Sequence, residues 1–138
     1  MLSKKTKYGL KALSYLAKQE QNVPVLISEI SNSENISKKF LESILLTLKK
    51  TGILSSKKGK GGGYYLLKSP SEIKLSTVIR ALEGPIAMLP CVSLNYYERC
   101  EDCKSEERCS LNILMAEVRD STLKILENKT LEDFHCGS

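Results

Sequence analysis

Residues 37–67, SKKFLESILLTLKKTGILSSKKGKGGGYYLL, contain the change of hydrophobic period that decides the fold. From Ser37 to about Thr51, apolar residues recur at helical spacing, and Ser37 is a favourable N-cap. Gly52 follows where a C-terminal glycine cap belongs. This part therefore predicts an amphipathic helix that ends before Gly52. Its predicted buried residues are Leu41, Ile44, Leu45 and Leu48.

After Gly52 the spacing becomes that of short strands. Residues 53–57 and 64–67 are candidate strands, and residues 58–63, KGKGGG, lie between them as a glycine-rich basic tip. Ser69-Pro70 ends the second candidate strand. The pattern predicts a β-hairpin with a long, flexible loop.

Helical periodicity also occurs on both sides of this stretch. Upstream it covers about residues 4–20 and 26–33, and a three-residue turn at 34–36 follows. Downstream it covers about residues 75–82 and 110–128. Two helices joined by a tight turn and followed by a hairpin have the order of a winged helix-turn-helix. The residues expected to face inward on the first two helices are Leu10, Leu13, Leu16, Ala17, Leu26, Ile27 and Ile30.

The last predicted helix carries a long apolar stripe. Positions 111, 118 and 125 repeat at heptad spacing, which is typical of helices that pair with other helices. The stripe could pack on the chain's own first domain, but one small domain can hardly bury all of it. We favour a partner helix from a second subunit. The expected fold is thus mainly α with a small β-hairpin: a winged helix-turn-helix domain plus a long C-terminal dimerisation helix. The stripe consists of Leu111, Leu114, Met115, Val118, Ile125 and Leu126.

Charge is distributed unevenly along the chain. Residues 1–85 hold 15 Lys and Arg against 6 Asp and Glu, whereas residues 86–138 hold 6 against 10. A basic first part indicates a polyanion partner for that part, although an uneven solvated surface would look the same. No apolar run is long enough to span a membrane, and no signal core follows the basic N-terminus, so we expect a cytoplasmic protein.

The N-terminal side of the predicted 37–51 helix is rich in polar groups. A helix fits the major groove of B-DNA, where lysine donates to guanine, glutamate accepts from cytosine and serine does either. Taken alone, these residues are more often only the wet face of an amphipathic helix. They are Ser37, Lys38, Lys39, Glu42 and Ser43.

The tip of the predicted hairpin favours the DNA-binding interpretation. Lys57, Lys58 and Lys60 surround glycines, including Gly61, that let backbone N–H groups approach phosphates without side-chain clashes. A mobile solvent loop is the alternative. Because the hairpin directly follows a helix-turn-helix, we expect phosphate or minor-groove contact. The expected partner is double-stranded DNA.

Four of the five cysteines lie within the irregular segment 86–110. They are Cys91, Cys100, Cys103 and Cys109. In a reducing compartment, clustered thiols indicate metal or redox chemistry before disulfides, and thiolates bind both iron–sulfur clusters and zinc. Structural zinc sites usually have two tight Cys pairs, and here only Cys100 and Cys103 form one. Free structural thiols are the remaining alternative.

The chain offers little for enzymatic chemistry. Its only histidine, His135, leaves no plausible histidine-based triad. The Cys100–Cys103 pair lacks the βαβ context of a redox enzyme. Cys136, beside His135, is interpreted as a tail thiol. We therefore predict that the chain is not an enzyme.

Several segments together resemble the winged-helix repressors of the IscR and NsrR type. The resemblance lies in Phe40-Leu41-Glu42, in residues 48–56, in the glycines 59 and 61–63 with Tyr64-Tyr65-Leu66, and in Val78-Ile79-Arg80-Ala81-Leu82-Glu83-Gly84-Pro85. Residues 7–13 and 130–134 resemble the opening and closing motifs of that family. The similarity covers nearly the whole chain.

This resemblance implies a homodimer on a pseudo-palindromic operator, with the long helices crossing between subunits. It implies that Glu42 and Lys58 contact bases, although the family often has Arg at the second position. It also favours an iron–sulfur cluster, 2Fe–2S or 4Fe–4S, over zinc, because the iron–sulfur members place three cysteines in this loop. Cys91 and Cys109 match the outer two, and the middle position has two candidates here. Some members carry no cluster.

The predicted protein is a DNA-binding repressor. A cysteine-ligated cluster is expected to modulate its affinity for DNA in response to redox state, nitric oxide or iron–sulfur status. Residues 1–85 form the expected DNA-binding domain, 86–110 the cysteine-rich loop, and 111–138 the dimerisation helix and tail. The alternatives are a regulator of the same fold that binds zinc or no cluster, and a zinc-stabilised interaction module.

Overall fold

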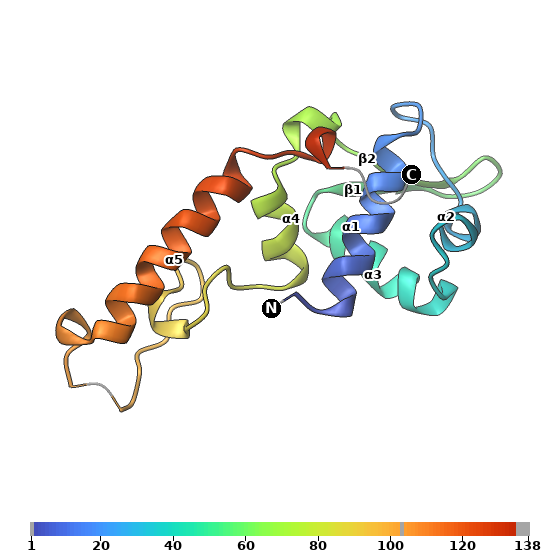
Figure 1. Ribbon diagram of the computed structural model, residues 1–138. Helices are drawn as coiled ribbons and strands as arrows, with labels where there is room; N and C mark the ends of the chain where they lie inside the picture. Colours follow the sequence, from blue (N-terminus) through green and yellow to red (C-terminus); the bar gives the residue numbers. More distant parts are fainter. Residues whose placement is uncertain (1, 103, 135–138) are drawn as a thin grey trace.

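The computed structural model describes residues 2–102 and 104–134. Figure 1 shows α4 between α5 on one side and α1 and α3 on the other. Among the described residues, no helix has the length and apolar character needed to cross a membrane. The elements are α1 (Lys4–Ala17), α2 (Ile27–Glu34), α3 (Lys38–Lys50), β1 (Leu54–Lys57), β2 (Gly63–Leu66), α4 (Leu75–Leu82) and α5 (Ser110–Glu127).

The helix-turn-helix forms as its sequence predicts. Asn35 ends α2 in the left-handed conformation, and the Ser37 hydroxyl caps α3 by accepting from the Phe40 N–H at 3.3 Å. All four predicted core residues of α3 are fully buried. Gly52 follows α3 with φ +82°, and the Ile53 N–H donates to the Leu48 carbonyl, which closes the helix end.

The hairpin has a third partner that the sequence pattern did not reveal. β1 and β2 pair antiparallel, with Leu54 opposite Leu66 and Lys57 opposite Gly63. Val25, just before α2, exchanges two backbone hydrogen bonds of 2.8 Å with Tyr64. The wing, defined as residues 54–66, is therefore anchored at its base to the segment that enters the helix-turn-helix.

Two local predictions were wrong. α1 ends at Ala17 and not near Glu20, since Lys18 and Gln19 already donate to carbonyls only three residues back, in a closing turn. Leu26 does not face inward: it is the N-cap of α2 with extended backbone, and it is 58% exposed. The helical stripe begins one residue later, with the half-buried Ile27 and the fully buried Ile30.

The chain returns to the winged domain after α5. The Leu75 N–H donates to the Lys129 carbonyl at 2.9 Å, and the Leu131 N–H donates to the Ile73 carbonyl at 3.0 Å. Leu131 is fully buried in the same hydrophobic core as α1 and α3. The C-terminal end of the 86–130 extension is therefore fastened to the winged domain.

Candidate nucleic-acid interface and cysteine site

The polar residues predicted to read DNA lie together on the exposed side of α3. Ser37, Lys38, Lys39, Glu42 and Ser43 are all exposed, because the opposite side of the helix forms the core. The hydroxyls of both serines already bind backbone groups: Ser37 caps α3, and Ser43 donates to the Phe40 carbonyl at 2.8 Å. Lys38, Lys39 and Glu42 are therefore the side chains best placed for new contacts.

The wing presents the second group of predicted residues. Lys57, Lys58, Lys60 and Gly61 are all exposed at or near the hairpin tip. A cationic tip beside an exposed helix with two lysines is suited to a polyanion such as DNA.

One contact that ties the wing to α3 is absent from the sequence prediction. Lys49, in the last turn of α3, donates from Nζ to the Ser56 Oγ of β1 at 2.7 Å. The two residues are seven positions apart and face each other only because the chain reverses at Gly52. Local periodicity therefore gave no signal for this pair.

A second missed residue is Glu83, at the end of α4. Its carboxylate accepts from Thr6 Oγ1 at 2.5 Å, from Ser3 Oγ at 2.8 Å and from the Ser3 N–H at 3.1 Å. These hydrogen bonds hold the pKa of Glu83 below its ordinary value. The Thr6 hydroxyl has the largest effect and the Ser3 hydroxyl the next largest. Glu83 thus caps the start of α1 from a distant part of the chain, where the helix dipole also favours a negative charge.

Three of the predicted metal ligands surround one cavity. Cys91, Cys100 and Cys109 line a space of about 280 Å³ at the start of α5. Cys91 and Cys109 are half-buried and Cys100 is exposed. In the described part of the chain, no three Cys, His, Asp or Glu side chains are close enough to hold a metal ion as they stand. Cys103, a fourth predicted ligand, lies outside the described residues, as do His135 and Cys136.

Side chains of α5 hold this segment in place. Asn112 Nδ2 donates to Cys91 Sγ at 3.3 Å, and Arg119 donates from a guanidinium nitrogen to the Val92 carbonyl at 2.8 Å. Tyr97 closes the segment by donating to Glu106 at 2.6 Å, and this bond raises the pKa of Tyr97. The cysteine segment and α5 therefore form one connected unit.

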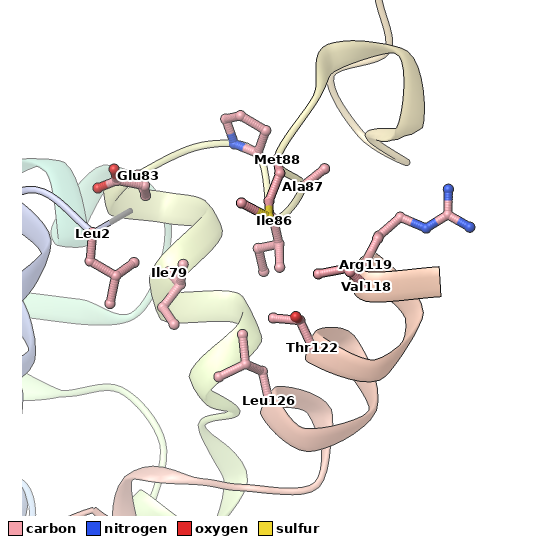
Figure 2. A pocket seen from close by; sticks show the side chains of 11 residues that line it. Leu2, Ile79, Glu83, Ile86, Ala87, Met88, Val118, Arg119, Thr122 and Leu126 are labelled. Carbon is pink, nitrogen blue, oxygen red and sulfur yellow. The ribbon is translucent and has the colours of Figure 1, made fainter. Parts of the chain in front are cut away.

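A larger cavity, of about 470 Å³, lies between parts of α4 and α5 (Figure 2). Ile79 of α4 and Thr122 and Leu126 of α5 point toward it, and residues 85–88 close one end. Its walls are mostly apolar. The long helix is thus incompletely packed against the winged domain.

Comparison with known proteins identifies the family. Residues 2–136 match the family described as "Rrf2: Iron-dependent Transcriptional regulator". The chain is 42% identical to an rrf2-like HTH-type transcriptional regulator of Rhodobacter capsulatus, over 96% of this chain and 91% of that protein. It is 32% identical to the regulator IscR of Pectobacterium carotovorum, over 96% of this chain and 77% of that protein.

Solved structures of proteins with similar sequences have the same fold. The structure of CymR, described as the global cysteine regulator of B. subtilis, superposes with a TM-score of 0.76 at 32% identity, over 96% of this chain and 94% of that one. IscR of T. potens superposes with a TM-score of 0.76 at 28% identity, over 96% and 84%. The predicted winged-helix fold is confirmed, and the chain belongs to the Rrf2 family of DNA-binding transcriptional regulators, which are not enzymes.

Proposed function

We propose that this regulator is a homodimeric repressor that reads a pseudo-palindromic operator. A cysteine-ligated iron–sulfur cluster modulates its affinity for DNA in response to redox state, nitric oxide or iron–sulfur status. The observation that carries the DNA-reading part is the exposed side of α3 next to a basic wing. The observation that carries the sensing part is the cavity lined by Cys91, Cys100 and Cys109 at the start of α5. Residues 1–85 serve DNA binding, 86–110 cofactor binding and 111–138 dimerisation.

In this proposal α3 enters the major groove by its N-terminal end. Glu42 accepts from a cytosine amino group, and Lys38 and Lys39 donate to bases or phosphates. Lys57, Lys58 and Lys60 of the wing contact the phosphate backbone or minor groove, with Lys58 nearest a base, and Gly61 lets the backbone come close. Ser37, which caps α3, and Ser43, which donates to the Phe40 carbonyl, support the start of the helix and add weaker contacts.

The cysteine segment is suited to a soft ligand set. Thiolates are the usual protein ligands of 2Fe–2S and 4Fe–4S clusters, and three sulfurs around one cavity fit such a group in donor chemistry. Cys91, Cys100 and Cys109 would hold the cluster, and the sequence offers Cys103 as a further ligand. When bound, the cluster supplies a redox-sensitive link between these cysteines.

The protein's own contacts provide a route from this site to DNA. Cys109 is the N-cap residue of α5, and Arg119 of α5 holds the Val92 carbonyl next to Cys91. A change in the cysteine segment therefore reaches α5, and through it the spacing of the two winged domains in a dimer. DNA affinity changes only by the difference in free energy with which the two states bind DNA.

The test compares cluster-loaded protein, purified without oxygen, with the cluster-free protein on a duplex selected from random sequences. We expect the two forms to differ in affinity for the selected duplex. Both should lose affinity steeply with salt while keeping a preference for that duplex. Equal affinities would remove the sensing role and leave DNA binding intact.

A cluster-free or zinc-binding regulator is the second candidate. It is favoured by the cysteine side chains, which form no ready ion site among the described residues. Iron, sulfide and zinc counts on anaerobically purified protein distinguish the candidates, because a zinc protein contains no iron and no sulfide. The visible spectrum gives the same distinction, since a zinc protein is colourless. The same counts test a zinc-stabilised interaction module, which would in addition show no preference among duplexes.

A further inference from the structure

Asn112 touches two of the cysteines that line the 280 Å³ cavity. It lies in the first turn of α5, is half-buried and lines the cavity itself. Its side-chain nitrogen donates to Cys91 Sγ at 3.3 Å, and its backbone N–H lies 3.4 Å from Cys109 Sγ. Cys91 and Cys109 stand at opposite ends of the cysteine segment, so one residue links both ends of the candidate site.

The two contacts differ in what they require of the side chain. The backbone N–H reaches Cys109 because Cys109 is the N-cap of α5, and any residue except proline at position 112 would supply it. The contact with Cys91 depends on an amide nitrogen at the end of a short side chain. Substitution of Asn112 therefore removes the bond to Cys91 and leaves the bond to Cys109 in place.

A hydrogen bond to a ligating sulfur has known consequences. It orients the sulfur and stabilises the more negative charge state of the bound group, so it raises the reduction potential of an iron–sulfur cluster. Loss of such an outer-shell partner typically weakens metal binding by about 10-fold to 100-fold. Both effects require a hydrogen-bond donor and no additional charge. A side-chain amide such as that of Asn112 provides a neutral donor.

We propose that Asn112 is the positioning residue of the cysteine site: it holds the Cys91 sulfur over the cavity and tunes the reduction potential of the group bound there. This rests on the proposed cysteine-ligated cofactor.

The test uses full-length protein with Asn112→Leu, which removes the donor at similar size, and Asn112→Asp, which keeps the shape but cannot donate when ionised. Asn95→Leu, at an exposed position of the same cysteine segment, is the matched control. Reduction potentials are measured by spectroelectrochemistry on reconstituted protein. Cobalt(II) affinity is measured on metal-free protein from the thiolate-to-cobalt absorption band.

We expect both Asn112 variants to have more negative reduction potentials than the wild type. We also expect them to bind cobalt at least about 10-fold more weakly than the wild type does. Asn95→Leu should match the wild type in both measurements. Wild-type potential and cobalt affinity in either folded Asn112 variant would overturn the proposal, with folding checked by thermal unfolding of the metal-free proteins.

The outcome for the cofactor itself is read separately. Wild-type protein that takes up no iron and sulfide but binds cobalt through thiolates would refute the proposed cluster, and the cobalt affinities would still decide the role of Asn112. Wild-type protein that binds neither would refute both.

Discussion

At the scale of single residues, Glu42 and Lys58 are expected to affect DNA binding in different ways. Glu42→Ala should mainly relax sequence choice, since a lost base contact costs about 1–3 kcal/mol only on the preferred sequence. Lys58→Ala should weaken binding to all duplexes. It should also reduce the slope of log affinity against log salt concentration by about one, the value for one lost phosphate contact. Affinities for a selected and a scrambled duplex at several salt concentrations measure both effects.

Lys124→Ala, at an exposed position on α5, is the control for general charge and should leave DNA binding unchanged. If Glu42→Ala and Lys58→Ala both retain wild-type affinity and specificity, the assignment of α3 and the wing as the DNA-reading surface is wrong.

Glu83 belongs to the same scale, because one carboxylate joins the end of α4 to the start of α1. Its pKa is held below the ordinary value of 4.5, so the ionised form is the stabilised one in the folded protein. Its contribution is complete above pH 4.5 and is lost as pH falls through the lower folded pKa. Glu83→Gln should therefore lower the free energy of unfolding at pH 7 by about 1 kcal/mol, the typical effect of a lost helix cap.

The measurement is urea unfolding of the wild type and Glu83→Gln at pH 7 and at several values below pH 4.5. The difference between the two proteins should shrink as pH falls, since protonated glutamate and glutamine are both neutral. Glu20→Gln, at an exposed carboxylate beyond α1, should show little difference at any pH. A Glu83→Gln difference that is constant with pH would contradict the capping role.

At the scale of elements, local pattern predicted the helices well and the pairing partners poorly. The residues 75–82 predicted for α4 are those observed, and the core face of α3 is correct throughout, because capping and period 3.6 are local properties. The Val25–Tyr64 pairing was missed, since a single extended residue carries no period. The contact of Lys49 with Ser56 depends on chain reversal, which local spacing does not encode.

The docking of the wing makes a prediction at this scale. Gly63 has φ +145°, and a Cβ there would overlap the Val25 carbonyl oxygen, which belongs to backbone that cannot easily move. Gly63→Ala should therefore separate β2 from Val25 and cost about 1–3 kcal/mol, or roughly 5 °C or more in Tm. Thermal unfolding followed by circular dichroism measures this.

Gly61→Ala is the matched control, since Gly61 also has a positive φ of +76° but nothing lies within 4 Å of its added Cβ. It should lower Tm less, by backbone strain alone. Equal losses in the two variants would show that wing docking does not limit the choice of residue at position 63.

At the scale of the whole molecule, sequence placed the candidate cysteines in one segment but could not say how they meet. In the structure Cys91, Cys100 and Cys109 line one cavity, and two contacts from α5, those of Asn112 with Cys91 and of Arg119 with Val92, hold the Cys91 end of the segment. Neither residue has the appearance of a site residue in the sequence, because each acts on a partner about 20 or more positions away. Cys103 remains a predicted ligand outside the described residues.

The unburied face of α5 is the other whole-molecule feature. Leu111, Leu114 and Ile125 are 53%, 50% and 62% exposed and lie along one side of the helix at heptad-like spacing. Ile113 is also 56% exposed, but it lies about 200° around the helix from Leu111. Substitutions on these two sides of α5 can therefore test the proposed dimer seam against a general effect of exposed apolar side chains.

If α5 pairs with a second copy along this seam, a carboxylate introduced there becomes a buried charge at the interface, whereas one introduced at position 113 stays in water. Leu114→Asp and Ile125→Asp should each weaken dimerisation at least about 10-fold, and Ile113→Asp should not. Sedimentation equilibrium over a range of protein concentrations measures the dissociation constants of the dimer. Affinity for the selected operator should fall in parallel, because a monomer can contact only one of its two half-sites. A wild-type monomer, or equal weakening by all three substitutions, would exclude this seam as the dimer interface.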